Sequence, residues 1–396
     1  MTREENIRRL LARNVETVID AERLAAALRS GKKLRVKHGI DPTGENIHMG
    51  RAVVLWKLKE FQALGHTVVL VIGDFTAQIG DPSDKLEKRP FLTAAAVKQN
   101  LKNYLPQIGT ILNLKKTEVR YNSEWLAKLN FRAISELADL FTFQQILERE
   151  NFSVRLKNHE PIGLREGLYP LMQGYDSVAI RADVELGGTD QLFNLLAGRK
   201  IQERYGQASQ DIMTTKMLLG TDNRKMSTSW GNVITIADTP EDMFGKVMAI
   251  HDGLIANYLA LATDASEEKI KHCIKELASG RNPKELKEEL AQSIVTRYHG
   301  AHAAKKAREE FSRVFSKKET PTEIPTLKLI NLQTYRLIDF VIQAGIKSKG
   351  EARRLIAQGG VSINGAVCKN PTATPEIKNG AILKIGKRRF YRLKRS

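Results

Sequence analysis

The chain has 396 residues, of which 42% are hydrophobic, so it is long enough for two or three globular domains. Its formal net charge of +18 indicates a polyanionic partner, although a generally basic proteome would give the same sign. Cys273 and Cys368 lie far apart and match no metal-binding spacing, which indicates a reducing compartment and no disulfide framework. The N-terminus lacks the apolar core of a signal peptide and no apolar run could span a bilayer, so we expect a cytoplasmic location and no membrane partner.

The start of the chain combines helices with a strand–helix–strand unit. Residues 3–30 predict one or two helices, because apolar side chains recur on one face (Ile7, Leu10, Leu11, Val15, Val18 and Ile19). A strand ends at 34–37, a helix follows at 52–61, and the β-branched run at 67–73 is typical of a parallel strand buried on both faces. A unit of this length implies a right-handed crossover, so we predict an α/β fold with a doubly wound parallel sheet.

The turn at residues 39–51 joins the first predicted strand to its helix. Such a turn presents free backbone N–H groups and the positive end of a helix dipole, which suit a phosphate. His48 can donate to an anion, and Gly50 lets a flat ligand approach the backbone. The alternative is a tight turn with an incidental histidine. After the next strand, Asp81 lies in a loop at the carboxyl end of the sheet, where a helix cap is favoured over a cation site.

Residues 93–150 are predicted to be mostly helical, with more apolar side chains than a solvated helix needs. These indicate either core or, as the sharper alternative, a subunit contact (Leu137, Leu140, Phe141, Phe143, Ile146 and Leu147). Further on, Tyr169, Gln173 and Asp176 share one face of a predicted helix. Because these polar groups would be costly in an apolar core, they indicate a pocket.

Three further segments complete the central part of the chain. A strand at 183–188 ends in a Gly-Gly turn, and polar residues stand where the next helix begins. Residues 220–229 form a hydroxyl-rich basic loop that suits closure over a triphosphate, although a plain exposed loop is the alternative. Residues 238–316 predict helices rich in Lys and Glu pairs, and Pro321 and Pro325 mark a linker after them.

The segment 334–396 is strongly basic. It holds 14 Lys and Arg residues against three acidic ones, so it supplies most of the net charge. Leu337 and Phe340 are among the residues that could form a core, and the Asn364-Gly365 pair predicts a hairpin turn. A concentrated basic patch on a small α+β module argues for binding to a phosphate backbone rather than for a solvated tail.

Taken in order, these motifs resemble a class I aminoacyl-tRNA synthetase, most closely the bacterial tyrosyl-tRNA synthetases. Residues 48–51 (His-Met-Gly-Arg) are similar to the His-x-Gly-His signature of that family, and residues 225–229 (Lys-Met-Ser-Thr-Ser) to its Lys-Met-Ser-Lys-Ser signature. The motifs at 169–176 and 187–191 stand between them in the expected order. The resemblance covers essentially the whole chain.

The resemblance implies four parts of the chain. A Rossmann-like catalytic domain would span 1–237, with N-terminal helices and a helical insertion and dimer region near 115–165. A helical anticodon-arm domain would span 238–320 and a linker 321–333. A small basic α+β RNA-binding domain would span 334–396, which resembles a module shared with a ribosomal small-subunit protein.

The resemblance also implies a set of site residues. The implied catalytic residues are His48, Arg51, Lys225 and Thr228. The implied ATP-binding residues are Asp41, Thr43, His48, Gly50, Gly188, Asp190, Lys225, Met226, Ser227 and Thr228. The implied tyrosine-binding residues are Gly39, Asp81, Tyr169, Gln173, Asp176 and Gln191, with Asn122 and Trp125 lining the pocket. Lys85 and Arg89 would meet pyrophosphate, and the implied RNA contacts are Lys349, Arg353, Arg354, Lys387, Arg388 and Arg389.

The implied reaction has two steps. The carboxylate of L-tyrosine attacks the α-phosphate of ATP, which enters as its Mg²⁺ complex without a protein-ligated metal, and the tyrosyl group then passes to the 3′ end of tRNA(Tyr). Asp176 would accept a hydrogen bond from the phenol. The implied assembly is a homodimer. Two alternatives remain: a degenerate paralogue that binds RNA without activating an amino acid, and a tryptophanyl-tRNA synthetase.

Three residues depart from the family pattern. Arg51 replaces the second signature histidine, and its charge could serve the same phosphates. Thr228 replaces the second signature lysine, and a lost charged contact is worth about 1.5–3 kcal/mol, or roughly 10- to 100-fold in rate. Lys37 stands where the other bacterial branch has a tyrosine that touches the phenol, so Asp176 is expected to act with a different partner.

Overall fold

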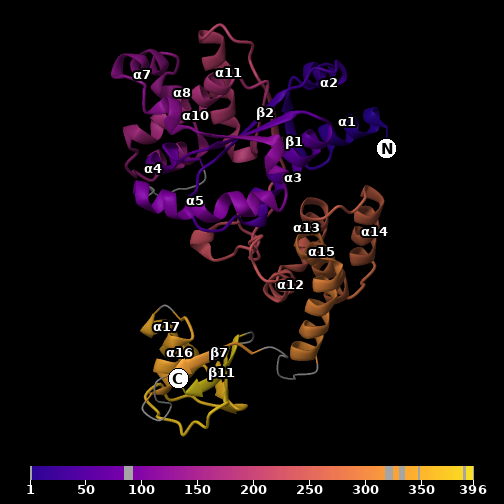
Figure 1. Cartoon of the computed structure of the whole chain (residues 1–396), viewed down its shortest axis with the longest axis vertical. Helices are drawn as coiled ribbons and strands as arrows, with labels where there is room; N and C mark the ends of the chain where they lie inside the picture. The colour runs from indigo at the N-terminus through magenta and orange to yellow at the C-terminus, as the bar shows by residue number, and fades with distance from the viewer. Residues whose placement is uncertain are drawn as a thin grey trace. The chain divides into compact units, whose positions relative to one another are not determined.

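The computed structural model of the chain describes residues 2–83, 92–316, 324–329, 335–346, 348–386 and 389–395. These residues fall into two compact units, Met1–Ala307 and Arg308–Ser396 (Figure 1). The first unit therefore contains both the expected catalytic domain and most of the expected helical domain, and the boundary between those two stays a prediction.

A six-stranded sheet forms the centre of the first unit in the described part of the chain. Its strands, in spatial order, are β1 (Val15–Ile19), β6 (Asp211–Thr215), β5 (Val184–Gly188), β2 (Arg35–Ile40), β3 (Thr67–Ile72) and β4 (Thr117–Tyr121). The last five run parallel, and β1 runs antiparallel to β6. The predicted doubly wound parallel sheet is confirmed, with one antiparallel strand added at its edge.

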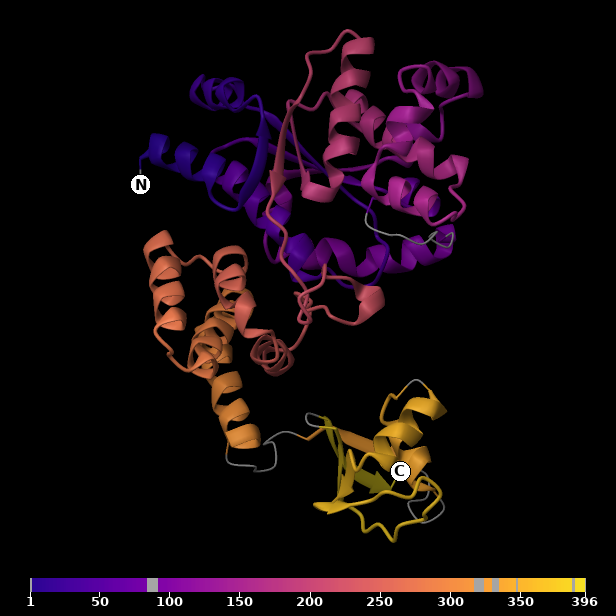
Figure 2. The same cartoon turned by 180° about the vertical axis from the view of Figure 1, so that it is seen from behind.

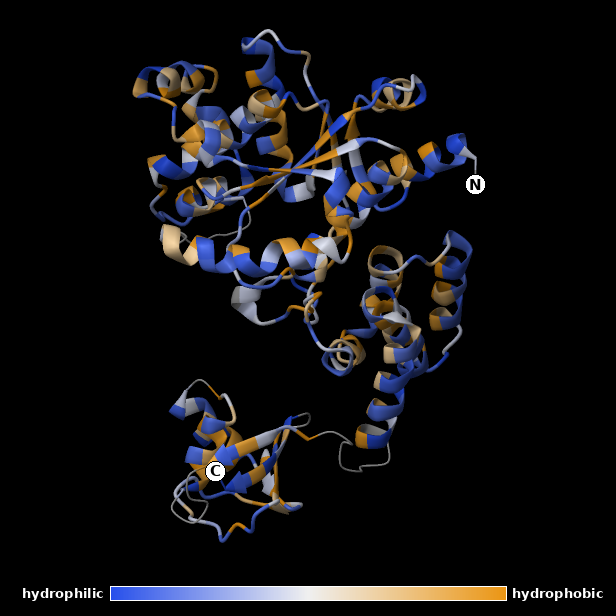
Figure 3. Ribbon diagram, viewed as in Figure 1, coloured by the Kyte–Doolittle hydropathy of each residue, from blue (hydrophilic) through white to orange (hydrophobic). Residues whose placement is uncertain are grey.

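Helices pack on both sides of this sheet. Those of the sheet region are α1 (Arg3–Ala12), α2 (Ala21–Arg29), α3 (Met49–Ala63), α4 (Thr76–Ile79), α5 (Ala94–Gly109), α6 (Ser123–Leu126), α7 (Phe131–Ala138), α8 (Phe143–Leu147), α9 (Glu150–Lys157), α10 (Leu164–Ile180) and α11 (Leu192–Arg204). Helices α3 and α5 lie on one side of the sheet, and α10 and α11 on the other (Figures 1 and 2). Hydrophobic residues run along the central strands between these layers (Figure 3).

The predicted helices at 238–316 are confirmed. They are α12 (Pro240–Met248), α13 (Ile255–Ala262), α14 (Glu267–Ala278) and α15 (Pro283–Phe311). Short 3-10 helices are η1 (Leu114–Lys116), η2 (Thr189–Gln191), η3 (Thr228–Trp230) and η4 (Asp252–Leu254), and a π-helix, η5, covers Ser312–Ser316. No helix of the described ranges has both the length and the apolar character needed to cross a membrane.

The prediction of one or two helices at 3–30 is confirmed for α1 and α2 but was wrong for Val15–Ile19, which form β1 between them. Asn14 and Asp20 adopt left-handed backbone conformations with φ of 57° and 62°, which separate the strand from the helices on either side. The β-branched residues between them fit a strand as well as a helix face, and pairing with β6 decides between the two.

In two further segments the prediction missed a short strand or helix. The mostly helical stretch at 93–150 contains β4, which pairs with β3 from Val68 to Ile72. The loop after β3 contains α4. The first strand is also longer than expected, because β2 continues through Gly39 to Ile40. Strands of five or six residues gain their hydrogen bonds from distant partners, so their local patterns are weak predictors.

The second unit holds a five-stranded sheet in its described residues. Its strands, in spatial order, are β7 (Thr326–Leu329), β11 (Arg389–Arg395), β10 (Ile382–Ile385), β8 (Val361–Ile363) and β9 (Ala366–Val367). Helices α16 (Leu337–Gln343) and α17 (Lys349–Ala357) pack against it around a buried core that includes Leu337 and Phe340. Asn364 and Gly365 both take positive φ between β8 and β9, so the predicted hairpin turn is confirmed.

The linker prediction was wrong for Thr326–Leu329. These residues form β7, which pairs in parallel with β11 from Arg392 to Arg395. The alternation of Leu327 and Leu329 with polar residues is the pattern of a strand with one buried side. The prediction gave more weight to Pro321 and Pro325, which are typical of a linker.

Candidate active site

A pocket lies at the carboxyl ends of β2, β3 and β5. The connection after β2 runs to β3 on one side, and the connection after β5 runs to β6 on the other. Ligands of doubly wound sheets bind at such a reversal, because the loops on either side diverge and leave a crevice. The residues that line it include His38, Gly39, Asp41, His48, Gly50, Arg51, Gly73, Thr76, Asp81, Asn122, Tyr169, Gln173, Asp176, Gly188, Asp190, Gln191, Lys225 and Met226.

Most of the residues implied by the family resemblance line this one pocket. They include all six residues expected to bind tyrosine and seven of those expected to bind ATP (Asp41, His48, Gly50, Gly188, Asp190, Lys225 and Met226). Thr43, Ser227 and Thr228 lie outside the lining, and Thr228 is exposed at the start of η3. Lys85 and Arg89, expected to contact pyrophosphate, lie outside the described residues.

His48 is the first residue of the first signature and caps the N-terminus of helix α3. Its ring atom Nδ1 accepts a hydrogen bond from the backbone N–H of Arg51 at 3.3 Å. That acceptor role assigns the ring hydrogen to Nε2, which can then donate to an anion. Backbone hydrogen bonds from Met49 to Ile234 (2.8 Å) and from Ile236 to Ile47 (2.9 Å) hold the turn against the segment that follows the second signature.

Gly50 is the point where the two signature motifs meet. Its backbone N–H donates to the thioether sulfur of Met226 at 3.4 Å. A Cβ added at Gly50 would lie 3.0 Å from Nδ1 of His48 and 3.5 Å from the carbonyl oxygen of Leu218. A side chain at this position would therefore crowd the His48 ring, which would have to shift to accommodate it.

Arg51 braces the turn from within. Its guanidinium donates to the carbonyl oxygen of Asp41 (3.1 Å), to the hydroxyl of Thr43 (3.0 Å) and to the hydroxyl of Tyr104 (2.9 Å). A planar guanidinium can satisfy three acceptors in different directions at once. Arg51 thus ties the end of β2 to helix α5, in addition to lining the pocket.

Asp41 follows the last residue of β2 and connects three elements. Its carboxylate accepts hydrogen bonds from the hydroxyls of Thr76 (2.7 Å) and Tyr169 (2.9 Å). A Cβ at Gly73 would lie 1.9 Å from Oδ1 of Asp41, so glycine is required there. Burial raises the pKa of the Asp41 carboxyl to about 6, and the nearby charge of Asp81 adds to that effect.

Asp176 is a buried carboxylate on the pocket side of α10. Trp125 donates its indole N–H to Oδ1 at 2.7 Å, and Asn122 donates its amide to Oδ2 at 3.4 Å. Trp125 and Asn122 are therefore the hydrogen-bond partners of Asp176, which the sequence alone did not identify. Burial raises the pKa of the Asp176 carboxyl to about 7, against the opposing charge of Lys37 and these hydrogen bonds.

A chain of polar contacts joins the tyrosine-side residues to the second signature. Gln191 donates its amide to Asp81 (2.8 Å) and to Asp190 (3.3 Å). The ammonium of Lys225 forms an ion pair with Asp190 at 3.1 Å. Asn194 donates to Gln173 at 3.0 Å. Polar groups at the pocket thus hold one another in place before a ligand arrives.

The second signature loop is organised by Asn232, which sequence reasoning missed. Its amide donates to the carbonyl oxygen of Lys225 (3.0 Å) and to Asp222 (2.7 Å), and its Oδ1 accepts from the backbone N–H of Ser227 (2.8 Å). Thr76, Gly73 and Asn194 were also missed. None belongs to a recognisable motif, and the one available signal was the position of Gly73 and Thr76 directly after a buried strand.

The comparisons with known proteins agree with this geometry. Residues 29–316 match the family model described as tRNA synthetases class I (W and Y). The chain belongs to this family. Residues 336–373 match the S4 domain. The chain is 48% identical to a tyrosine–tRNA ligase of Thermotoga maritima, over 99% of this chain and 98% of that one, and 45% identical to one of Aquifex aeolicus, over 99% of each.

Solved structures of class I tRNA synthetases share the fold. The tyrosyl-tRNA synthetase of Archaeoglobus fulgidus complexed with L-tyrosine aligns with a TM-score of 0.62 and 21% identity, over 78% of this chain and all of that one. The tryptophanyl-tRNA synthetase of Plasmodium falciparum aligns with a TM-score of 0.58 and 16% identity, over 78% of this chain and 89% of that one. The fold alone therefore does not distinguish a tyrosyl-tRNA synthetase from a tryptophanyl-tRNA synthetase. The residues of the pocket are needed to distinguish them.

The second unit presents the expected basic residues at its surface. Lys349, Arg353 and Arg354 are exposed on α17, and Arg389 is exposed on β11. Lys387 and Arg388 lie outside the described residues. A small module that clusters cations over its own buried core is suited to contacts with a phosphate backbone.

Proposed function

We propose that this chain is a tyrosine–tRNA ligase, which joins L-tyrosine to tRNA(Tyr) at the expense of ATP. The observation that carries the proposal is the buried carboxylate of Asp176 in the pocket lining. A carboxylate in that position matches a substrate whose side chain ends in a hydroxyl. The sequence identities of 48% and 45% to tyrosine–tRNA ligases of two bacteria, each over 99% of this chain, support the same conclusion.

The tyrosine substrate is held at both ends. Its phenol donates a hydrogen bond to Asp176, while Gln173, Tyr169 and Asp81 accept from its α-ammonium. Gln191 lies beside its carboxylate. Trp125 and Asn122 donate hydrogen bonds to the Asp176 carboxylate without any substrate. A substrate that lacks the hydroxyl cannot add the phenol hydrogen bond to this buried group, and the loss of that hydrogen bond is the reason why the pocket rejects phenylalanine.

Activation of tyrosine needs no enzyme nucleophile. An oxygen of the tyrosine carboxylate forms a bond to the α-phosphorus of ATP, and the bond from that phosphorus to the bridging oxygen breaks, so pyrophosphate leaves with the electron pair. His48 donates to the phosphates from Nε2, Gly50 makes room for the adenine, and Asp190 holds the ribose. The residues act by positioning the reactants and by stabilising charge on the transferring phosphate.

The second signature loop supplies positive charge near the leaving group. Lys225 exchanges its ion pair with Asp190 for the phosphates of the bound nucleotide. Mg²⁺ enters as part of the ATP substrate, bound to its phosphates. The described residues contain no cluster of three or more His, Cys, Asp or Glu side chains that could hold a metal ion.

The proposed transfer step passes the tyrosyl group from the adenylate to the terminal ribose of tRNA. Exposed cations of the second unit bind the RNA backbone, and the cytoplasm is the site of the reaction. We propose that the active form is a homodimer, because Phe131, Phe143 and Leu164 are 85%, 68% and 67% exposed in the single chain. Large exposed apolar side chains on neighbouring helices are typical of a subunit contact.

Tyrosine-dependent exchange of pyrophosphate into ATP tests the proposal. The purified chain is expected to catalyse exchange with tyrosine and to give only background exchange with tryptophan. Exchange driven by tryptophan would instead identify a tryptophanyl enzyme. Binding of tRNA without any exchange at saturating ATP and tyrosine would identify the degenerate paralogue, which the changes at Arg51 and Thr228 motivate.

Asp176→Ala provides the matching test of the site assignment. The variant is expected to lose tyrosine activation while it still binds tRNA, because the change removes the phenol acceptor and leaves the second unit intact. Loss of both properties together would mean that the assignment of Asp176 is wrong or that the variant is misfolded, which circular dichroism separates.

A further inference from the structure

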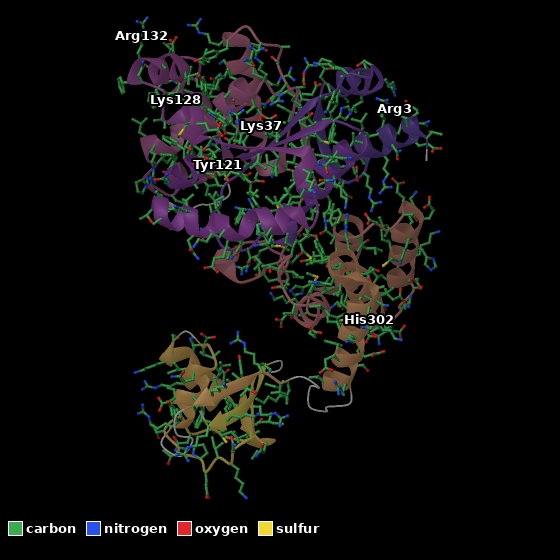
Figure 4. The ribbon with its side chains drawn as sticks, in the orientation of Figure 1. Arg3, Lys37, Tyr121, Lys128, Arg132 and His302 are labelled. Atoms are coloured by element: carbon green, nitrogen blue, oxygen red, sulfur yellow. The ribbon has the colours of Figure 1, made fainter. Side chains whose placement is uncertain are left out.

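Lys37 is a lysine in the interior of the first unit, next to the pocket but outside its lining. It lies on β2, its side chain is 0% exposed, and its label falls over the sheet region in Figure 4. A buried ammonium is costly unless it is fully paired, so its contacts require an explanation.

The ammonium of Lys37 has three hydrogens and three acceptors. It donates to the backbone carbonyl oxygen of Gln173 (2.7 Å) and to the hydroxyl of Ser177 (2.8 Å), and it forms an ion pair with Glu185 at 2.8 Å. Gln173 and Ser177 are one turn apart on α10 and stand on either side of Asp176. Asp176 lies on this helical turn. Lys37 therefore links the turn to strand β2.

Glu185 completes the arrangement from β5. Its carboxylate accepts a hydrogen bond from the hydroxyl of Ser177 at 3.0 Å and from the side-chain amide of Gln173 at 3.3 Å. Gln210 donates a further hydrogen bond to it. Gln173 is thus held by its backbone to Lys37 and by its side chain to Glu185.

The pair also sets the electrostatic surroundings of Asp176. The charges that act on the ionisation of this carboxylate include those of Lys37 on β2, which lowers its pKa, and Glu185 on β5, which raises it. The polar donors Asn122 and Trp125 approach it from the region of α6. Burial raises the pKa of Asp176 to about 7, and the Lys37 charge lowers that pKa.

We propose that Lys37 is a positioning residue that determines specificity for the phenol of the substrate, because its hydrogen bonds hold the turn of α10 that carries Gln173 and Asp176, and its positive charge favours the ionised form of Asp176. The inference rests on the proposed function. It assigns a selective role to a residue that does not itself touch the substrate. An ionised Asp176 accepts the phenol hydrogen in a charge-assisted hydrogen bond, which phenylalanine cannot make.

Lys37→Met is the first variant to measure, in tyrosine-dependent ATP–pyrophosphate exchange between about pH 6 and pH 9. The KM for tyrosine at neutral pH is expected to rise roughly 10- to 100-fold, as for loss of a charged hydrogen bond. The KM for ATP should change much less, and the preference for tyrosine over phenylalanine should fall. The pH above which tyrosine binds well should move upwards, by about one unit or more.

Glu185→Gln tests the sign of the electrostatic effect. Removing the Glu185 charge leaves Lys37 unopposed beside Asp176, so the pH profile for tyrosine should move downwards, opposite to Lys37→Met. The double variant Lys37→Met/Glu185→Gln removes both charges, and its profile should lie between those of the single variants. A purely structural role would shift the two single variants in the same direction.

Lys57→Met is the matched control, because Lys57 is also buried. Its side chain is 2% exposed, donates to the carbonyl oxygen of Leu10 (3.0 Å) and pairs with Glu60 (2.7 Å), away from the pocket lining. The variant should lose stability yet keep the wild-type KM for tyrosine and its pH profile.

The outcomes separate this inference from the proposed function. If the wild-type chain shows no tyrosine-dependent exchange, the proposed function fails and the inference fails with it. If the wild type is active, an unchanged KM and pH profile in Lys37→Met would overturn the inference alone. Should Lys37→Met not fold, Glu185→Gln decides, since an unchanged or upward-shifted profile in that variant also overturns it.

Discussion

The backbone N–H of Gly50 donates a hydrogen bond to the sulfur of Met226 at 3.4 Å. These residues belong to the two signature motifs and are themselves 176 positions apart in the chain. The contact brings the start of helix α3 against the second signature loop, with Lys225 beside it in the same pocket lining. The position of that loop therefore helps to define the surroundings of Gly50.

Gly50→Ala should impair the use of ATP. The added Cβ would lie 3.0 Å from Nδ1 of His48 and would crowd the ring that is proposed to contact the phosphates, so the KM for ATP in the exchange reaction should rise about 10-fold or more. The KM for tyrosine should stay within about twofold. Gly253→Ala is the control, because nothing lies within 4 Å of a Cβ there; equal KM values for ATP in both variants would contradict the assignment.

Arg51→Lys should lower the exchange rate although it keeps the positive charge. Lysine cannot span the three acceptors that the guanidinium reaches on Asp41, Thr43 and Tyr104, so the turn after β2 should loosen. We expect a loss of about 10-fold in kcat/KM for ATP. Full activity in Arg51→Lys would instead indicate that the positive charge at position 51 is sufficient and that the three hydrogen bonds are not required. Arg132→Lys, at an 88% exposed side chain, should have no effect.

Asp176→Asn should stabilise the fold at high pH while it abolishes tyrosine activation. The pKa of Asp176 is raised by burial from 3.8 to about 7, so the folded chain binds more protons than the unfolded chain between these values. The free energy of unfolding contributed by this group therefore falls as the pH rises through that window and is lowest above pH 7. The neutral amide avoids this ionisation cost.

Chemical denaturation at about pH 5 and pH 8 measures the effect. Asp176→Asn should gain about 1–3 kcal/mol of unfolding free energy relative to wild type at the higher pH, less at the lower pH. Asp176→Ala should not show the same gain, because it leaves a cavity and two unpaired donors on Asn122 and Trp125. A gain for Asp176→Asn that is equal at both pH values would contradict the proposed ionisation.

Charged substitutions on α7 and α8 should disrupt the proposed homodimer. Phe131→Asp and Phe143→Asp place a carboxylate at side chains that are 85% and 68% exposed in the single chain. Sedimentation velocity should show the mass of two chains for wild type and of one chain for the double variant. Val367→Asp, at a 59% exposed residue of the second unit, should leave the mass unchanged. A wild-type chain that sediments as a monomer would refute the dimer.

The amino-acid sequence by itself determined the class of the fold and the family. The β-branched run of β3, the helical face of α10 and the two signatures are local patterns, since a side chain's neighbours along a helix or strand are set by spacing alone. These patterns were sufficient to predict a doubly wound sheet, and the family resemblance that the motifs carry implied most of the residues that line its pocket. They were not sufficient where a β-branched or short segment fits either structure, as in β1, β4 and β7.

Only the tertiary structure decided which polar groups are partners. Tyr169 donates a hydrogen bond to Asp41, 128 positions away in the chain, and Trp125 donates one to Asp176, 51 positions away. Helix and strand periodicity relates only residues a few positions apart, so it could not predict either pair. The same holds for Lys37, whose place in the sequence shows a departure from a family pattern but not its burial between Gln173, Ser177 and Glu185. Such contacts depend on the packing of whole helices against the sheet, because burial then makes each unpaired polar group costly and selects its partner.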